Sequence, residues 1–297
     1  MEARPLVLIT GVSGFLGSYL ARTFLGLGWR VAGLSRRSSG LNRLEDLRSA
    51  IRLFDWGGTP FDGGEPLRLR DSVVIHTATD YGRAGSDTDE IAAANVARPL
   101  ELLRRSLNEG SRCFINTDTF YPPERDLYAR SKREFLDAAR VAVNGAPLAF
   151  VNLRVHHMYG PGDGMTKFIP WVIRQCLANA PLNLTSGEQE RHFIFISDVL
   201  EAFRLTAEGI GVGAVSMHDV ATDERYTLRA LVELIRELTC SKSVCSFGVV
   251  PHLPGEIFLP VVESGGLKQL GWYPRVSLRV GLEQTIAWER NHRSSSG

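Results

Sequence analysis

The sequence has few cysteines, no surplus of charge of either sign and no long apolar run. Its four cysteines, Cys113, Cys176, Cys240 and Cys245, form no C-x-x-C pair and are too few for a disulfide framework and wrongly spaced for a zinc site. The 34 Lys and Arg residues balance 33 Asp and Glu residues to a formal net charge of +1, so no positive surplus is present to hold a nucleic acid. No stretch approaches the roughly 20 apolar residues that cross a bilayer, and no signal-like segment precedes the apolar run at residues 6–9. We therefore expect a cytoplasmic protein that binds neither membrane nor nucleic acid.

In the first half of the chain, short apolar runs alternate with amphipathic stretches. The runs predict strands at residues 6–9, 30–34, 51–54, 72–76, 112–116 and 148–153. The amphipathic stretches predict helices at residues 15–27, 41–49, 87–108 and 126–143, and Pro99 should kink or divide the third. This alternation is typical of βαβ units and predicts an α/β fold with a Rossmann-type, doubly wound parallel sheet.

The second half lacks this regular alternation and has helical patterns at residues 168–178 and 228–238 among loop-rich segments. We expect a Rossmann domain at residues 1–155, with residues 193–219 returning to it. Residues 156–192 and 220–297 should form a smaller mixed region.

Three glycines follow the first predicted strand, in the segment Thr10-Gly11-Val12-Ser13-Gly14-Phe15-Leu16-Gly17. The first suits a sharp turn, the second a close backbone approach to pyrophosphate, and the third tight packing of a helix on a strand. Because the motif lies between a strand and a helix, it predicts a dinucleotide site. The candidate cofactor contacts are Gly11, Ser13, Gly14, Phe15, Leu16 and Gly17.

The end of the second predicted strand indicates which dinucleotide is bound. An NAD site usually has an acid here for the ribose 2'-hydroxyl, whereas this chain has Ser35, Arg36 and Arg37. Arginine can engage phosphate oxygens in pairs. We therefore predict NADP(H), held through Ser35 and Arg36, with Arg37 as a further candidate contact and a solvent-exposed basic turn as the alternative.

A tyrosine and a lysine four residues apart, Tyr128 and Lys132, fall on one face of the helix predicted at residues 126–143. The segment Asn116-Thr117-Asp118-Thr119 ends the preceding strand, at the edge where open α/β sheets bind ligands. The sequence therefore places hydroxyls and an ammonium at one candidate ligand-binding edge.

These features together resemble the short-chain dehydrogenase/reductase superfamily, and specifically its extended branch, which modifies nucleotide sugars. The resemblance covers nearly the whole chain. Besides the glycine motif and the Tyr128/Lys132 pair, the matching pieces are His76 to Thr79, Asn95-Val96, Leu153-Arg154, Tyr159 to Asp163, Arg191 to Val199, Leu270 to Pro274, and Gly281-Leu282 with Trp288.

The resemblance implies roles for individual residues. Tyr128 would give a proton to the substrate carbonyl, Lys132 would stabilise the tyrosine anion and hold the nicotinamide ribose, and Thr117 would hydrogen-bond the carbonyl oxygen. Asp55 would contact the adenine and Ala78 the cofactor ribose. The implied substrate contacts are Thr79, Asp118, Thr119, His157, Lys167 and Arg191, where an ion pair of Arg191 with a nearby glutamate is the alternative. A homodimer through the helices at residues 87–108 and 126–143 is also implied.

Residues beside the triad favour one reaction of this branch. The resembling dehydratases have Asp-Glu where this chain has Asp118-Thr119, and the resembling epimerase-reductases have a cysteine in place of Thr119. The segments Thr77 to Arg83 and Phe114 to Phe120 look most like reductases of nucleotide-linked 4-keto-6-deoxyhexoses. We therefore expect NADPH-dependent reduction of such a keto-sugar.

Several alternatives stay open. The chain could be a 4-epimerase that retains NAD, or a non-catalytic sensor of NADP(H). Thr117 and Tyr128 are only 11 residues apart, so the loop that covers the sugar in most relatives is short. This favours a bulkier ketone as another alternative and leaves Thr119 as a rival to Thr117. No acid or cysteine at a suitable spacing accompanies His156 and His157, so we expect no metal site.

Overall fold

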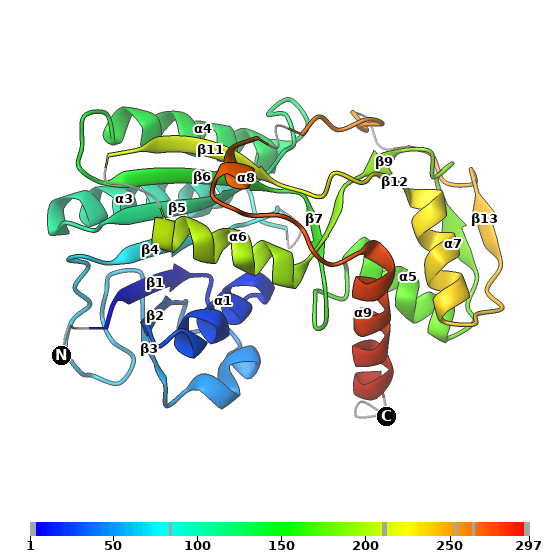
Figure 1. Cartoon of the computed structure of the whole chain (residues 1–297), viewed down its shortest axis with the longest axis horizontal. Helices are drawn as coiled ribbons and strands as arrows, with labels where there is room; N and C mark the ends of the chain where they lie inside the picture. The colour runs from blue at the N-terminus through cyan, green and yellow to red at the C-terminus, as the bar shows by residue number, and fades with distance from the viewer. Residues whose placement is uncertain (1–3, 83–84, 210–212, 253–254, 263–264, 294–297) are drawn as a thin grey trace. The chain divides into compact units, whose positions relative to one another are not determined.

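The computed structural model describes residues 4–82, 85–209, 213–252, 255–262 and 265–293 (Figure 1). The chain divides into two compact units, one of residues 1–155 with 200–218 and the other of residues 156–199 with 219–297. Arg83, part of one segment that carries the resemblance, lies outside the described residues.

The first unit is built on a seven-stranded sheet with the strand order β11-β6-β5-β4-β1-β2-β3. The strands are β1 (Leu6–Thr10), β2 (Arg30–Leu34), β3 (Ile51–Phe54), β4 (Val73–His76), β5 (Cys113–Asp118), β6 (Ala149–Val155) and β11 (Val215–Val220). All the strand pairs among β1, β2, β3, β4, β5 and β6 are parallel. Because the order reverses at β1 and β4, the carboxyl ends of these strands form the crevice where such sheets bind ligands. The predicted Rossmann-type α/β fold is confirmed.

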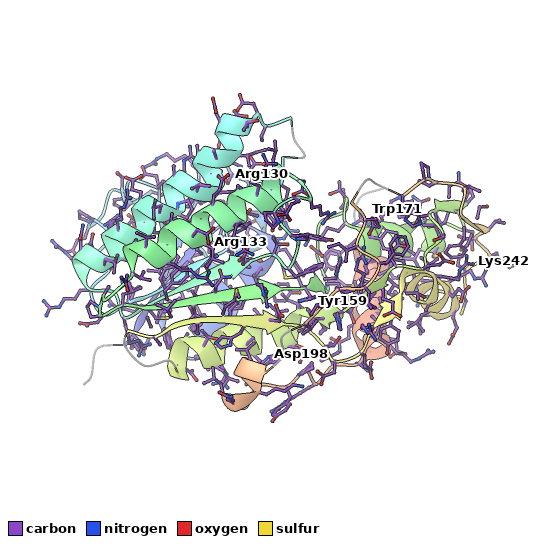
Figure 2. The ribbon with its side chains drawn as sticks, turned by 90° about the horizontal axis from the view of Figure 1, so that it is seen from above. Arg130, Arg133, Tyr159, Trp171, Asp198 and Lys242 are labelled. Carbon is purple, nitrogen blue, oxygen red and sulfur yellow. The ribbon has the colours of Figure 1, made fainter. Side chains whose placement is uncertain are left out.

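Helices cover both faces of this sheet. They are α1 (Phe15–Gly26), α2 (Thr88–Ala92), α3 (Arg98–Glu109), α4 (Leu127–Ala142) and α6 (Ile196–Gly209). Figures 1 and 2 show α3 and α4 side by side on one face, with Arg130 and Arg133 on the outer side of α4. No helix in the described part of the chain is long and apolar enough to cross a membrane.

The helix predicted at residues 87–108 is divided, as the proline suggests. A π-helical turn, η2 (Ala93–Ala97), separates α2 from α3, and Pro99 lies in the first turn of α3, where its missing N–H costs nothing. The α-helix predicted at residues 41–49 is wrong, because the chain there forms a 3-10 helix, η1 (Asn42–Leu47). Only Leu44 of that segment is buried, so no apolar stripe is available to hold a longer helix.

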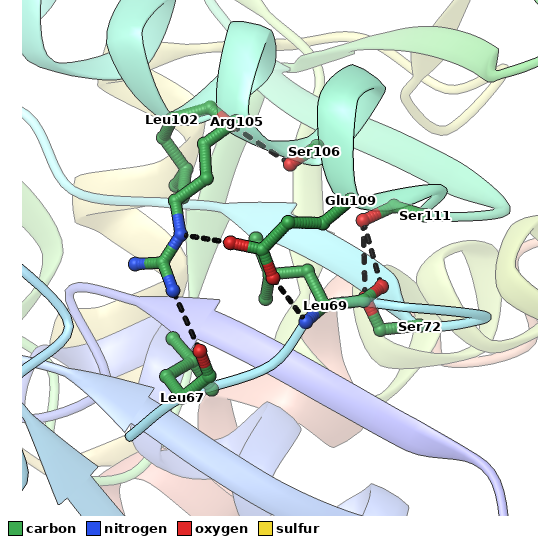
Figure 3. Close-up of polar contacts among 8 residues, drawn as sticks. All are labelled: Leu67, Leu69, Ser72, Leu102, Arg105, Ser106, Glu109 and Ser111. Atoms are coloured by element: carbon green, nitrogen blue, oxygen red, sulfur yellow. Dashed lines mark hydrogen bonds and ion pairs between the residues drawn. The ribbon is translucent and has the colours of Figure 1, made fainter.

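The segment that leads into β4 is fastened to α3 by a polar network (Figure 3). Arg105 donates to the Leu67 carbonyl at 2.6 Å and pairs with Glu109 at 2.6 Å, and Glu109 accepts from the Leu69 N–H at 2.8 Å. Apolar packing completes the same face, where Phe114 of β5 and Phe150 of β6 pack on Phe135 of α4. On this face of the sheet, α3 is therefore held by polar contacts and α4 by apolar packing.

The second unit combines short sheets with helices. Its strands pair as β7 (His157–Tyr159) with β10 (Phe193–Phe195), β9 (Glu190–Arg191) with β12 (Tyr226–Thr227), and β8 (Leu182–Leu184) with β13 (Cys245–Phe247). Its helices are α5 (Phe168–Leu177), α7 (Leu228–Leu238), α8 (Gly265–Gln269) and α9 (Leu278–Arg293). The buried pair of Glu289 with Arg174 at 2.7 Å joins α9 to α5. The mixed character predicted for this half is confirmed.

Candidate active site

The turn between β1 and α1 requires its glycines. Gly11 has a φ of +63°, and a Cβ there would lie 2.9 Å from the backbone of Ala78, so a side chain has no room. A Cβ on Gly17 would collide with the carbonyl of Gly11. The turn therefore lies flat against the end of β4 and packs α1 close to β1.

The first turn of α1 is open to a ligand. Its N-cap is Gly14, which offers no side chain to satisfy the first N–H groups. Phe15 and Leu16 are buried, so these N–H groups are held in place by packing. A helix start with uncapped N–H groups binds phosphate well, and the pyrophosphate of a dinucleotide fits this cradle.

At the end of β2, the two arginines differ. Arg37 donates to the Pro60 carbonyl at 3.3 Å, and its guanidinium lies 4.7 Å from the centre of the Phe61 ring. Arg36 is exposed, and although its backbone carbonyl accepts hydrogen bonds from Ser35 and Ser39, its guanidinium makes none with the described residues. Ser35 is buried. Arg36 is therefore the cation available to a phosphate at this position.

The ends of β1 and β4 are joined at Thr10. Its hydroxyl oxygen accepts from the N–H groups of Thr77 and Ala78 at 3.1 Å and lies 2.8 Å from Nδ1 of His76. Burial, aided by the charge of Lys132, lowers the pKa of His76 well below its ordinary value, so the ring is neutral. Asp55 caps its own turn by accepting from the Thr59 N–H at 2.9 Å.

Lys132 reaches the end of β5 from α4. Its Nζ donates to the Thr117 carbonyl at 2.8 Å, and only 3% of the residue is exposed. Burial lowers the pKa of Lys132 to about 8, and the negative charge of Asp118 acts in the opposite direction. The helix start that places Lys132 is fixed by Asp126, whose carboxylate accepts from the Ala129 N–H at 2.7 Å.

Tyr128 lies one helical turn before Lys132. Its ring centre is 4.9 Å from that of Tyr81. Burial raises the pKa of Tyr128 well above 10, the charges of Tyr81 and Asp118 add to the rise, and a hydrogen bond with Thr119 lowers it. The phenol is therefore protonated at neutral pH and able to act as an acid.

The two candidate hydroxyls have different surroundings. Thr119 bonds the Tyr128 phenol and accepts from the Tyr121 N–H at 3.2 Å. The Thr117 hydroxyl is buried and has no hydrogen-bond partner among the described residues. A substrate oxygen would therefore find Thr117 uncommitted and Thr119 engaged.

Two other predicted substrate contacts of the first unit are also engaged. Asp118 accepts from the Thr119 N–H at 2.7 Å and from Asn152 at 2.6 Å. The Thr79 hydroxyl donates to Asn95 at 3.2 Å.

The second unit contains the remaining predicted substrate contacts. Lys167 pairs with Asp163 at 2.9 Å, and the His157 ring packs on Phe193. Arg191 is buried, donates to the Ile257 carbonyl at 2.6 Å and pairs with Glu256. The arginine does form an ion pair, but its partner is far along the chain.

Some residues of the site lack a sequence signal of their own. Asn95 binds both the Asp80 backbone and the Ser131 hydroxyl, so it ties the loop that carries Tyr81 to α4. It lies in the π-helical turn, and such turns often occur at functional sites. Asn95 was visible only as part of a family motif, and Tyr81 only as part of a resembling segment.

The chain is similar to known proteins over most of its length. Residues 7–214 match the model of the NAD dependent epimerase/dehydratase family. The chain is 30% identical over 297 residues to the CDP-abequose synthase of Salmonella typhimurium, covering 95% of this chain and 98% of that one. It is 23% identical over 323 residues to a dTDP-4-dehydro-6-deoxy-D-allose reductase of a Streptomyces species, covering 97% of each.

Among solved structures, the UDP-glucose 4-epimerase of Thermotoga maritima superposes with a TM-score of 0.81 at 21% identity, over 97% of this chain and 99% of that one. At this identity the likeness concerns the fold. The family match spans the glycine turn, the Tyr128/Lys132 pair and most of the chain, so the protein belongs to the NAD dependent epimerase/dehydratase family, in the extended short-chain dehydrogenase/reductase branch.

Proposed function

We propose that the protein reduces a keto group on a nucleotide-linked 4-keto-6-deoxyhexose with NADPH. The observation that carries the proposal is the placement of Tyr128 and Lys132 one turn apart in α4, with Lys132 bonded to the Thr117 carbonyl at the carboxyl end of β5 in a Rossmann-type sheet. The similarity to a CDP-abequose synthase over nearly the whole chain supports a deoxysugar nucleotide as the substrate class.

The cofactor would lie on the uncapped start of α1, with Gly11 allowing its pyrophosphate to approach the backbone. Arg36 would bind the 2'-phosphate, because it is exposed and its guanidinium lacks a partner among the described residues. When bound, NADPH supplies the hydride. Asp55, beside its own turn, would meet the adenine, and Ala78 the ribose.

The chain's own residues supply the proton. Tyr128 donates its phenolic proton to the ketone oxygen as negative charge develops there, and Thr117 donates a hydrogen bond to the same oxygen. The phenolate that remains is stabilised by the Lys132 ammonium, which is mostly protonated at neutral pH because its pKa is about 8. Arg191 would contact the diphosphate of the substrate once Glu256 gives way.

The test is consumption of NADPH with a panel of CDP-, dTDP-, UDP- and GDP-linked 4-keto-6-deoxyhexoses, with NADH in parallel and Tyr128→Phe as the control variant. We expect turnover with NADPH on one nucleotide series and its collapse in Tyr128→Phe. No turnover across the panel, despite measurable NADPH binding, would reject the nucleotide sugar and point to a bulkier ketone or a sensor. Purification with firmly bound NAD would favour the 4-epimerase instead.

A further inference from the structure

Three polar side chains form a hydrogen-bonded row across β5 and β6. Asn116 Nδ2 donates to Asn152 Oδ1 at 2.6 Å, and Asn152 Nδ2 donates to Asp118 Oδ2 at 2.6 Å. Asn116 and Asn152 are 0% and 1% exposed and lie opposite each other in the strand register. Burying amides and a carboxylate in a sheet costs free energy even when they pair with one another, and Asn116 Oδ1 has no hydrogen-bond partner among the described residues. Apolar residues of similar volume would avoid this cost.

The row lies on the side of the sheet that α4 covers. Side chains of a strand alternate between its faces, so Phe114, Asn116 and Asp118 share one face of β5. Phe114 packs on Phe135 of α4, which identifies that face. Lys132 approaches the end of β5 from the same helix.

Asp118 is held in one orientation at the end of this row. One carboxylate oxygen accepts from the Thr119 N–H at 2.7 Å and the other accepts from Asn152. Its charge raises the pKa of Lys132, against the effect of burial, and raises the pKa of Tyr128. Tyr81 from the loop after β4 and Asp126 at the start of α4 also raise the pKa of Tyr128, and the hydrogen bond with Thr119 lowers it. The charge of Lys132 lowers the pKa of His76 from β4.

We infer that Asn116 and Asn152 are positioning residues: their hydrogen-bonded row fixes the Asp118 carboxylate at the end of β5, on the face that α4 covers with Lys132 and Tyr128, so that both side chains keep their protons. The inference rests on the proposed function, because a reductase must begin each turnover with a proton on its tyrosine. An enzyme that begins by removing a proton needs the opposite balance, since an unopposed ammonium would favour the phenolate.

The scarcity of lysine allows a direct test without substrate. Of the 34 basic residues, only Lys132, Lys167, Lys242 and Lys268 are lysines. Selective carbon-13 labelling of the lysine Cε therefore yields few signals in a titration by nuclear magnetic resonance, and a Lys132→Arg variant assigns the one of interest. We expect the Lys132 signal of the whole protein to titrate near pH 8.

Two variants separate charge from hydrogen bonding. Asp118→Asn removes the charge and should lower the Lys132 midpoint by about one pH unit. The double variant Asp118→Asn with Asn152→Asp keeps a carboxylate and both hydrogen bonds of the row but moves the charge from β5 to β6. We expect the titration midpoint of Lys132 in the double variant to stay below that of the wild type, although the row keeps the same number of amides and carboxylates.

Asn152→Leu tests the positioning role, because it leaves the carboxylate in place without its partner. It should lower the midpoint by a smaller amount. Asp137→Asn, an exposed change on α4, removes the same charge from the surface and should leave the midpoint unchanged. Equal midpoints in the wild type, Asp118→Asn and Asn152→Leu would overturn the inference, as would restoration of the wild-type midpoint by the double variant or an equal shift in Asp137→Asn.

A kinetic measurement links the row to the reaction. In Asp118→Asn, the fall of kcat for NADPH oxidation at high pH should begin about one pH unit lower than in the wild type. The KM for NADPH should change little. An unchanged kcat profile in Asp118→Asn would overturn the inference. Because the titration needs no substrate, its result stands apart from any failure of the proposed reaction.

Discussion

The ammonium of Lys132 donates a 2.8 Å hydrogen bond to the backbone carbonyl of Thr117, which joins α4 to the end of β5. The contact brings the proposed catalytic residues of a strand and a helix into one cluster within the first unit. A buried ammonium is costly, so the cluster should trade stability for activity.

Replacing Lys132 with methionine should make the protein more stable and nearly inactive. Holding an ammonium whose pKa is about 8 rather than 10.5 costs about 3 kcal/mol at neutral pH, and the lost hydrogen bond returns about 1 kcal/mol. We expect a gain of about 2 kcal/mol in the free energy of unfolding, measured with denaturant.

The gain should depend on pH in a defined direction. Because the folded-state pKa of Lys132 is lowered, the destabilisation is complete below pH 8 and fades as the pH rises toward 10.5. The difference in stability between the variant and the wild type should therefore shrink from pH 7 to pH 10. A difference that grows over this range would contradict the account.

The two threonines should behave differently when replaced with valine. Thr117→Val removes a hydroxyl that has no partner among the described residues, so stability should hardly change while kcat falls about a hundredfold. Thr119→Val removes bonds to Tyr128 and Tyr121, so it should cost stability and reduce kcat less. Thermal unfolding and steady-state kinetics measure both effects, and the reverse order would make Thr119 the catalytic hydroxyl.

Arg36→Ala should raise the KM for NADPH about tenfold or more and leave the KM for NADH nearly unchanged, because only NADPH carries the 2'-phosphate. Arg37→Ala is the matched control, since this guanidinium is already held by Pro60 and Phe61. Equal effects of Arg36→Ala on both cofactors would remove the basis for NADPH preference.

Glu256→Gln should lower the KM for the nucleotide sugar severalfold. In the structure Glu256 pairs with Arg191, and the substrate diphosphate would compete for the same guanidinium. Initial rates over a range of substrate concentrations measure the effect, and Glu188→Gln, a change at a nearby acid outside this pair, is the control. A KM that rises in Glu256→Gln would show that Arg191 serves only to hold the segment around Ile257.

The helices α3 and α4 should form the interface of a homodimer. Val141 on α4 is 80% exposed and Leu127 is 42% exposed, so apolar side chains lie on the free side of this helix. Val141→Asp should shift the protein to a monomer in sedimentation velocity, while Val244→Asp, an exposed apolar change in the second unit, should not. A wild-type protein that sediments as a monomer would contradict this prediction.

Local patterns explain which parts of the fold were predictable. The strands β1 to β6 and the helices α1, α4 and α7 follow from periodicity and turn residues, since each buries apolar side chains. The strands β7 to β13 were not predicted. Residues 41–49 have apolar positions but bury only Leu44, so tertiary packing did not support the α-helix.

The parts of the candidate site formed by residues close in the sequence were predictable, and those formed by residues far apart in the sequence were not. Tyr128 and Lys132 share a helix face, and their spacing is visible in the sequence. Asn152 lies in a strand that reads as apolar, and its partners Asn116 and Asp118 are more than 30 residues away, so no local pattern indicates the row. The partner of Arg191 is hidden in the same way, because Glu256 comes 65 residues later.

The central claim is that hydride moves from NADPH to the sugar while Tyr128 supplies the proton. The most direct measurement uses NADPH deuterated at the transferable position, a 4-keto-6-deoxyhexose nucleotide, and mass spectrometry of the sugar product. The account predicts one deuterium in the product with the wild type and almost none with Tyr128→Phe. A product without deuterium, formed while the cofactor is not consumed, would contradict the reductase and indicate an epimerase.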